Sequence, residues 1–289
     1  NLHFNRNLIP ILKSCITDLS MNNLLFYGPY KSGKKTIMNA TIKEIYDFNK
    51  LKEYNETLRI NNNNLVVSYL CSSNHFVINP SKYNLHDKNI ISQLIKIISK
   101  TKNFSNNLKI IVIDDADKLS SEAQQGLRRT MEIYSRNCKF ILLGKKLNKI
   151  MNPIQSRCLK IRCSKPNINH LSQRLDNLNT EFNLNLDQNG KMKILKICNL
   201  NFQTLYLIID MIYNLKIPIN EISYPKNKVE ILVEKIFNSN NIKEFLNFKE
   251  ILTKIIVDNI NLNELKNNIL FLVIKKEITN EQKAILIKE

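Results

Sequence analysis

The sequence predicts an α/β domain, with a parallel sheet covered by helices on both faces, followed by smaller all-α parts. Two short apolar runs, 24–27 and 109–113, have the length and composition of buried strands. Amphipathic helical patterns and further β-rich segments alternate with these runs, which is typical of a parallel sheet enclosed by helices. After Pro166 only helical patterns are found, so the architecture changes there.

The elements of the α/β part follow from hydrophobic periodicity. We expect helices over 4–16 and 34–48, on either side of the first strand, and later helices over 87–102 and 120–135. The remaining strands are expected over 58–60, 65–70, 75–78, 139–143 and 159–163.

Three domains are predicted: the α/β domain over 1–165, a small helical domain over 166–224 and a second all-α domain over 225–289. The helices of the small domain are expected over 171–182, 188–198 and 202–214. The helices of the last domain are expected over 226–237, 242–259, 262–274 and 279–288. These are apolar on one face, so we expect them to pack on one another or on a neighbouring subunit.

Charge is unevenly distributed along the chain. The formal net charge is +18, with +16 in residues 1–165 and +2 in residues 166–289. A basic excess in one part favours nucleic acid as a partner there, while the alternative is a solvated Lys-rich surface caused by codon bias. No apolar run reaches the ~20 residues that span a bilayer, so we expect no membrane association. The six cysteines form no Cys-x-x-Cys pair and are expected to be free thiols.

The turn after the first strand fits a phosphate-binding template of Gly28, four residues, Gly33 and then Lys34. Backbone amides at the start of the following helix have no partner within the helix and favour anions. The template ends in Ser or Thr, whose hydroxyl ligates Mg²⁺, but Lys35 occupies this position. An ammonium cannot ligate a cation, so the loop can hold a nucleotide while its metal chemistry stays open. The alternative is a plain connection between strand and helix.

The second buried strand ends in acidic residues, beginning with Asp114 and Asp115. In phosphate-loop ATPases the first acid after such a strand anchors the metal, and its neighbour polarises the attacking water. The alternative is that residues 114–117 cap the helix that begins near Ser120.

Five strings together resemble the small subunits of replication factor C, the AAA+ clamp loader that opens the sliding clamp and places it on primed DNA. They lie at 28–36, 79–81, 117–120, 123–132 and 153–158. The resemblance implies a P-loop AAA+ domain, a helical lid and an all-α collar. Compared with the family pattern, the chain begins within the first helix, lacks the preceding Arg-Pro segment and has a short collar.

The resemblance implies a role for individual residues. Binding of ATP or ADP is expected at Gly28, Pro29, Ser32, Gly33, Lys34, Lys35 and Thr36, with Mg²⁺ left open. Arg157 would be an arginine finger that reaches a neighbour's phosphates, and the alternative is an ordinary surface ion pair. Arg128 and Glu132 share a helix face that lines the subunit boundary in the family, and the alternative is a salt bridge within the helix.

The resemblance also implies contact with primer–template DNA. Lys88, at the start of the helix from Asp87, is the first candidate for a phosphate contact, since that helix start also offers free amides. Weaker candidates are Lys82, Arg128 and Arg129. The alternative for Lys88 is a solvated side chain.

Several residues depart from the family pattern. Besides Lys35, these are Lys31 for a loop glycine, Asp115 for glutamate, Lys145 for the polar sensor and Gln203 for the sensor arginine. We therefore expect slow or absent hydrolysis by this chain.

The expected assembly is a nuclear hetero-pentamer with large and small replication factor C subunits, which acts on the sliding clamp (proliferating cell nuclear antigen) in DNA replication and repair. The alternative function is an autonomous AAA+ ATPase acting on nucleic acid, of the helicase-loader or branch-migration type.

Overall fold

The computed structural model describes residues 5, 7–17, 22–46, 51–60, 63–72, 75–100, 109–198 and 200–216. The chain divides into two compact units, Asn1–Leu178 with Cys198–Leu205, and Asn179–Ile197 with Tyr206–Glu289. Each unit is considered by itself. The boundaries at 165 and 224 stay predictions, and the collar predicted for 225–289 lies outside the described residues.

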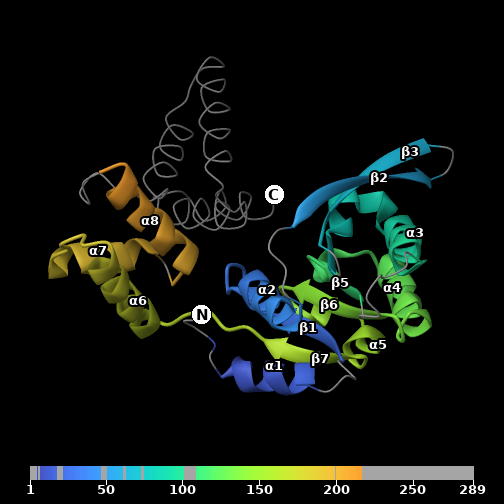
Figure 1. Ribbon diagram of the computed structural model, residues 1–289, viewed down its shortest axis with the longest axis horizontal. Coiled ribbons are helices and arrows are strands. Elements are labelled where there is room, and N and C mark those ends of the chain that lie inside the picture. The colour runs from blue at the N-terminus through green and yellow to red at the C-terminus, as the bar shows by residue number, and fades with distance from the viewer. Residues whose placement is uncertain are drawn as a thin grey trace, which may run out of the picture. The chain divides into compact units, whose positions relative to one another are not determined.

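The first unit is built on a seven-stranded sheet with the order β2-β3-β4-β5-β6-β1-β7 (Figure 1). Its strands are β1 (Asn23–Tyr27), β2 (Lys52–Ile60), β3 (Asn63–Cys71), β4 (His75–Ile78), β5 (Lys109–Ile113), β6 (Cys138–Gly144) and β7 (Cys158–Arg162). From β4 to β7 every pair of neighbouring strands is parallel, as the alternating pattern predicts.

The strands β2 and β3 differ from this prediction, because they form a long antiparallel hairpin. Only Leu58 and Ile60 of β2 are buried, and the preceding residues 52–57 are polar and mostly exposed. Hydrophobic periodicity indicates only 58–60, because only this end of the strand is buried. Residues 52–57 form part of the strand because they pair with β3, although their side chains are not buried.

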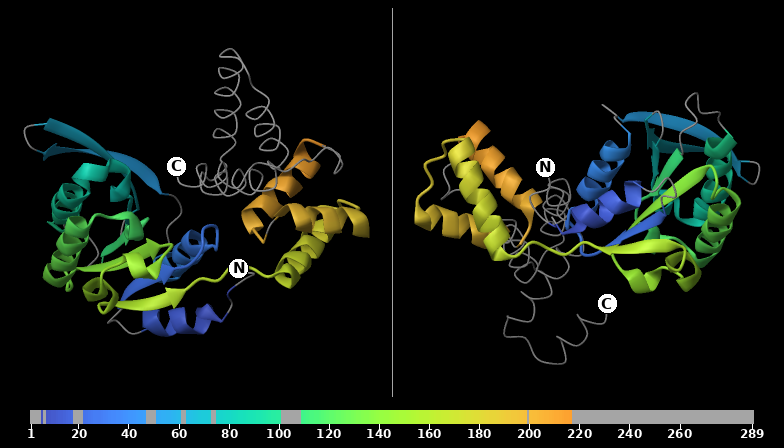
Figure 2. Two further views of the ribbon diagram at one scale, coloured as in Figure 1. Left: turned by 180° about the vertical axis from the view of Figure 1, so that it is seen from behind. Right: turned by 60° about the horizontal axis from the view of Figure 1, so that its bottom comes forward.

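Helices cover both faces of the sheet. Successive residues of a strand point to opposite faces, so each interior strand contributes side chains to both layers. In β1, Leu24 and Phe26 pack in one apolar cluster with residues of α1 (Leu8–Thr17) and α2 (Lys34–Ile45). Leu25 packs in the other cluster with residues of α3 (Asp87–Lys100) and α4 (Ser121–Ile133) (Figure 2). The interior strands are therefore buried on both sides, and their ends position the loops.

Short elements complete the unit, and their length left no periodic signal in the sequence. They are η1 (Pro80–His86), η2 (Ala116–Lys118), η3 (Leu147–Lys149) and α5 (Asn152–Gln155). The later helices are α6 (Ile168–Glu181), α7 (Gln188–Cys198) and α8 (Phe202–Asn214). Among the described helices, none is long and apolar enough to cross a membrane.

Candidate nucleotide-binding site

The loop between β1 and α2 has the backbone that its glycines permit. Gly28 has φ 150°, and a Cβ atom there would lie 2.0 Å from the carbonyl oxygen of Cys163, at the end of β7. Gly33 has φ 80° and directly precedes α2. Both residues need a conformation that other residues rarely adopt. The loop therefore passes closely over the sheet and turns into the helix.

Lys31, which replaces a family glycine, also has a positive φ of 59°. A left-handed conformation costs a residue with a side chain about 1–2 kcal/mol. The loop adopts its turn despite this cost.

The Lys34 ammonium folds back over the loop. Its Nζ atom donates to the carbonyl oxygens of Gly28 at 2.8 Å and Pro29 at 2.6 Å, and to Ser32 Oγ at 3.3 Å. Burial lowers the pKa of Lys34, and the charge of Lys145 lowers it further. The ammonium lies at the centre of the loop, where it can meet a phosphate.

Lys35 forms an ion pair with Asp114, the first acid after β5, and its Nζ atom lies 2.6 Å from Asp114 Oδ2. Asp114 is the acid expected to anchor Mg²⁺, and Lys35 stands where the metal-ligating hydroxyl is expected. The donor set therefore does not fit Mg²⁺, because one ligand is replaced by an ammonium and the other already binds it.

Asp115 is also paired with a lysine. Its Oδ2 atom accepts a hydrogen bond from Lys118 Nζ at 2.7 Å, and its φ is 50°. Burial raises the pKa of Asp115, but the hydrogen bond and charge of Lys118, together with Lys145 and Asn79, bring this pKa below its usual value. A carboxylate held ionised by an ammonium is a weak base for an attacking water.

The remaining acid of this segment, Asp117, has a structural role. Asp117 is buried and accepts hydrogen bonds from the backbone amides of Lys145 at 3.0 Å and Lys146 at 3.3 Å. The N-cap of α4 is Ser120, whose Oγ accepts from the Ala123 amide at 3.1 Å. The alternative in which residues 114–117 cap this helix is therefore wrong.

At the sensor position, Lys145 follows β6 and places its Nζ atom 5.1 Å from the centre of the Tyr30 ring. Lys31 Nζ lies 5.5 Å from the same ring. The loop tip thus carries cation–π contacts. Gln203, at the predicted position of the second sensor, lies in the first turn of α8, where its backbone N–H donates to Asn201 Oδ1.

Arg157 lies in the turn between α5 and β7, away from the loop. Its Nη1 atom donates to the Pro153 carbonyl at 2.6 Å, and Nη2 lies 2.5 Å from Glu132 Oε1. The same Oε1 accepts from Arg128 Nε at 3.2 Å. Both ion pairs named as alternatives from the sequence are therefore present in this chain.

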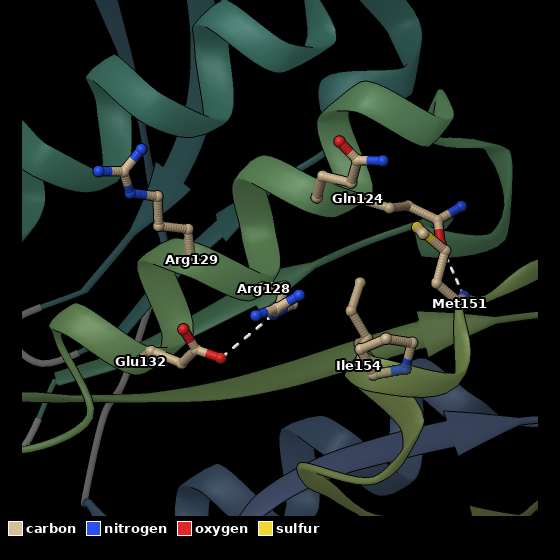
Figure 3. A pocket seen from close by; sticks show the side chains of 8 residues that line it. Gln124, Arg128, Arg129, Glu132, Met151 and Ile154 are labelled. Carbon is tan, nitrogen blue, oxygen red and sulfur yellow. Dashed lines mark hydrogen bonds and ion pairs between the residues drawn. The ribbon is translucent and has the colours of Figure 1, made fainter.

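A cavity of about 430 Å³ lies beside these arginines, between α4 and α5. Figure 3 shows Arg128 turned toward Glu132, and Gln124 bonded to the backbone of Met151. The cavity is lined by Gln124, Gln125, Arg128, Arg129, Glu132, Met151, Pro153 and Ile154.

The candidate DNA contacts lie on the first unit. Lys88 Nζ is 3.0 Å from Glu122 Oε2, and both side chains are exposed. The Lys88 amide donates to the Asp87 carboxylate, so this amide is not open to a phosphate. Lys82 and Arg129 are exposed, in η1 and α4 respectively.

A protein-family model described as DNA polymerase III, delta subunit, matches residues 5–167. The chain belongs to this clamp-loader family. The family's fold, with its phosphate loop, is that of AAA+ nucleotide-binding domains.

Similar curated proteins include replication factor C subunit 5 of Oryza sativa subsp. japonica, which is 32% identical over 69% of this chain and 59% of its own length. Replication factor C subunit 3 of Arabidopsis thaliana is 31% identical over 77% of this chain and 66% of its own length. Replication factor C subunit 3 of Homo sapiens is 32% identical over 57% of this chain and 48% of its own length. The chain thus spans about half to two thirds of these relatives.

Among solved structures, the Holliday junction branch migration motor RuvB of Thermotoga maritima is similar in fold. Its TM-score is 0.52 at 13% identity, covering 98% of this chain and 82% of that chain. At this identity the likeness shows the fold alone.

The two ion pairs Lys35–Asp114 and Lys118–Asp115 are not among the contacts predicted from the sequence. Lys118 lies three residues after Asp115, a spacing at which opposite charges meet in a short helical turn, so the sequence held a signal. The contact of Lys35 with Asp114 joins the first turn of α2 to the end of β5, and no local pattern indicates it.

Proposed function

We propose that this chain is a small subunit of a replication factor C clamp loader, which uses ATP to open a sliding clamp and place it on primed DNA. The observation that carries the proposal is an imbalance within the chain. Arg157 lies at the surface, with 36% of its side chain exposed. The two carboxylates after β5 are instead each paired with a lysine of the same chain. Such a chain suits a mixed assembly, in which its neighbours perform the hydrolysis.

Within this assembly the chain binds ATP or ADP at 28–36 and hydrolyses it poorly. Aspartate at position 115 is one methylene shorter than the glutamate of active members, and Lys118 already holds it at 2.7 Å. Displacing a catalytic group by about 1 Å can cost on the order of 100-fold in rate. Lys35 removes the metal-ligating hydroxyl as well.

Arg157 is the group that this chain offers to a neighbour's nucleotide. A permanently charged, planar guanidinium stabilises the charge that develops on a transferring phosphoryl group. Its partner Glu132 lies at the surface, where solvent screening makes an ion pair weak. The phosphates of a neighbour can therefore replace Glu132 at small cost.

The partners in this proposal are the other replication factor C subunits, large and small, the sliding clamp and primer–template DNA. The basic first unit and the exposed Lys82, Lys88, Arg128 and Arg129 support contact with the DNA backbone. A nuclear location and a role in DNA repair belong to the proposal too, although the relatives include a mimivirus protein.

The test is an assembly reconstituted from all subunits, in which ATP turnover stimulated by clamp and DNA is measured. We expect Arg157→Ala to lower turnover at the neighbouring site by about 10³-fold, the usual effect of losing an arginine finger. Arg136→Ala removes an exposed arginine near the end of α4 and should leave turnover unchanged. Full turnover with Arg157→Ala would refute the proposed role of this residue.

Native mass spectrometry of the complex that co-purifies with this chain distinguishes the proposal from the branch-migration alternative. A complex with four related subunits supports a clamp loader, whereas a homo-hexamer would support an autonomous motor. The fold likeness to RuvB does not favour the motor, because a shared fold does not fix function.

A further inference from the structure

The ion pair between Lys35 and Asp114 brings a cation to the place where the family's phosphate loop uses a metal. Lys35 lies in the first turn of α2, directly after the loop, and its Nζ atom reaches Asp114 Oδ2 at 2.6 Å. The Lys35 side chain is 66% exposed and that of Asp114 is 14% exposed. The ammonium therefore contacts a partly buried carboxylate on one side and is open to solvent on the other.

Mg²⁺ and this ammonium compete for the same carboxylate. Mg²⁺ requires oxygen ligands at about 2.0–2.1 Å in near-octahedral geometry. Here the hydroxyl ligand is absent, and Asp114 Oδ2 already accepts a charge-assisted hydrogen bond. A metal ion would have to displace Lys35, and position 35 would offer it no oxygen ligand in return.

The loop has other ammonium groups to balance the charge of a nucleotide. Lys34 Nζ lies over the loop within hydrogen-bonding distance of Gly28 and Pro29. Lys145 Nζ lies 5.1 Å from the centre of the ring of Tyr30, which is a residue of the same loop. Together with Lys35 they provide the positive charge that a diphosphate or triphosphate group needs.

We propose that the loop holds its nucleotide as a free anion, without a divalent cation, and that the Lys35 ammonium links Asp114 to the outer phosphate in the metal's place. The inference rests on the proposed nucleotide site and specifies its ligand, a metal-free nucleoside diphosphate or triphosphate. Static binding follows from it, because the ammonium fixes the phosphates but supplies no ligand sites for ordering a water.

The test is calorimetric titration of ADP into the full chain, in excess EDTA and in excess magnesium chloride. The wild-type affinity should agree between the two conditions to within about twofold. Lys35→Met removes the charge and should weaken binding about tenfold in both, the loss expected for one charge-assisted hydrogen bond. Lys35→Thr restores the hydroxyl and should bind weakly in EDTA but recover about tenfold with magnesium.

Lys43→Met is the matched control, because Lys43 is exposed in the last turn of the same helix. It should bind ADP like the wild type in both conditions. A wild-type affinity that rises tenfold or more with magnesium would overturn the inference, and so would a wild type that binds ADP in neither condition. Neither result changes the outcome expected for Arg157→Ala, so the proposed role in the clamp-loader assembly is tested independently.

Discussion

The Arg157 guanidinium and the Glu132 carboxylate meet at 2.5 Å, at the surface between α4 and the turn after α5. This contact joins the proposed finger to the helix that carries Arg128, whose Nε atom bonds the same carboxylate oxygen. The two contacts of Glu132 thus hold the proposed finger against α4 within this chain.

Replacing Glu132 with Gln should have a small effect compared with removing Arg157. Solvent screening makes an exposed ion pair weak, so turnover of the reconstituted assembly should change by no more than about fivefold. The measurement is steady-state ATP turnover with clamp and DNA, compared with Arg157→Ala. A Glu132→Gln variant as inactive as Arg157→Ala would mean that the acid, rather than the arginine, carries the function.

Replacing Gly28 with Ala should disrupt the loop. The added Cβ would lie 2.0 Å from the Cys163 carbonyl oxygen, at a φ of 150°, so we expect a loss of about 3 kcal/mol or more in unfolding free energy. Urea denaturation measures this loss. The control is Gly126→Ala in α4, where a Cβ meets nothing within 4 Å. There alanine should stabilise the helix by about 1 kcal/mol, and equal effects at the two glycines would contradict the described loop.

Replacing Asp115 with Asn should destabilise the fold in a pH-dependent manner. The pKa of Asp115 is lowered from its ordinary value of 3.8, so its ionised form stabilises the folded state. This contribution is fully present above the ordinary pKa and is lost as the pH falls through the lower folded-state pKa. Asparagine tolerates the positive φ, which leaves the backbone unstrained.

The measurement is thermal unfolding of both proteins from pH 7 to pH 3. The variant should be less stable by about 1 kcal/mol at pH 7, and the difference should shrink at the acid end. Glu53→Gln, at an exposed position of β2, is the control and should show no such trend. A difference between Asp115→Asn and wild type that stays constant with pH would argue against the pairing with Lys118.

Replacing Lys88 with Ala should weaken DNA binding by the assembly and make it less sensitive to salt. Loss of one phosphate contact lowers the slope of log affinity against log salt by about 1. Fluorescence anisotropy with primer–template DNA over a salt series measures both quantities. Lys96→Ala, at an exposed position further along α3, should leave the slope unchanged, and an unchanged slope for Lys88→Ala would remove this residue from the interface.

The interior of the fold could be predicted from the sequence because its signals are local. The strand at 109–113 is buried throughout, and α7 and α8 have the predicted bounds, since an uninterrupted apolar face defines each. The polar part of β2 could not be predicted, because its stability comes from hydrogen bonds to β3 rather than from its own side chains.

The site was predictable in its members but not in its pairings. The sequence identifies Asp114 as the acid of the metal site. It also identifies Lys35 and Asp115 as departures from the family pattern at that site. Which carboxylate meets which ammonium depends on the strand order and on the turn at η2, and these are tertiary properties. The prediction of free amides at the start of α3 failed for Lys88 because Asp87 binds that amide itself.

The hairpin of β2 and β3 has a consequence for solubility. Among the described strands, β2 lies at the edge of the sheet and pairs with β3 alone, so the backbone donors and acceptors on its outer side could recruit a foreign strand. Its charged residues are Lys52, Glu53, Glu56 and Arg59, and side chains of mixed sign on an unpaired margin oppose such recruitment. The same polarity that hid this strand from hydrophobic periodicity thus guards the protein against self-association into aggregates.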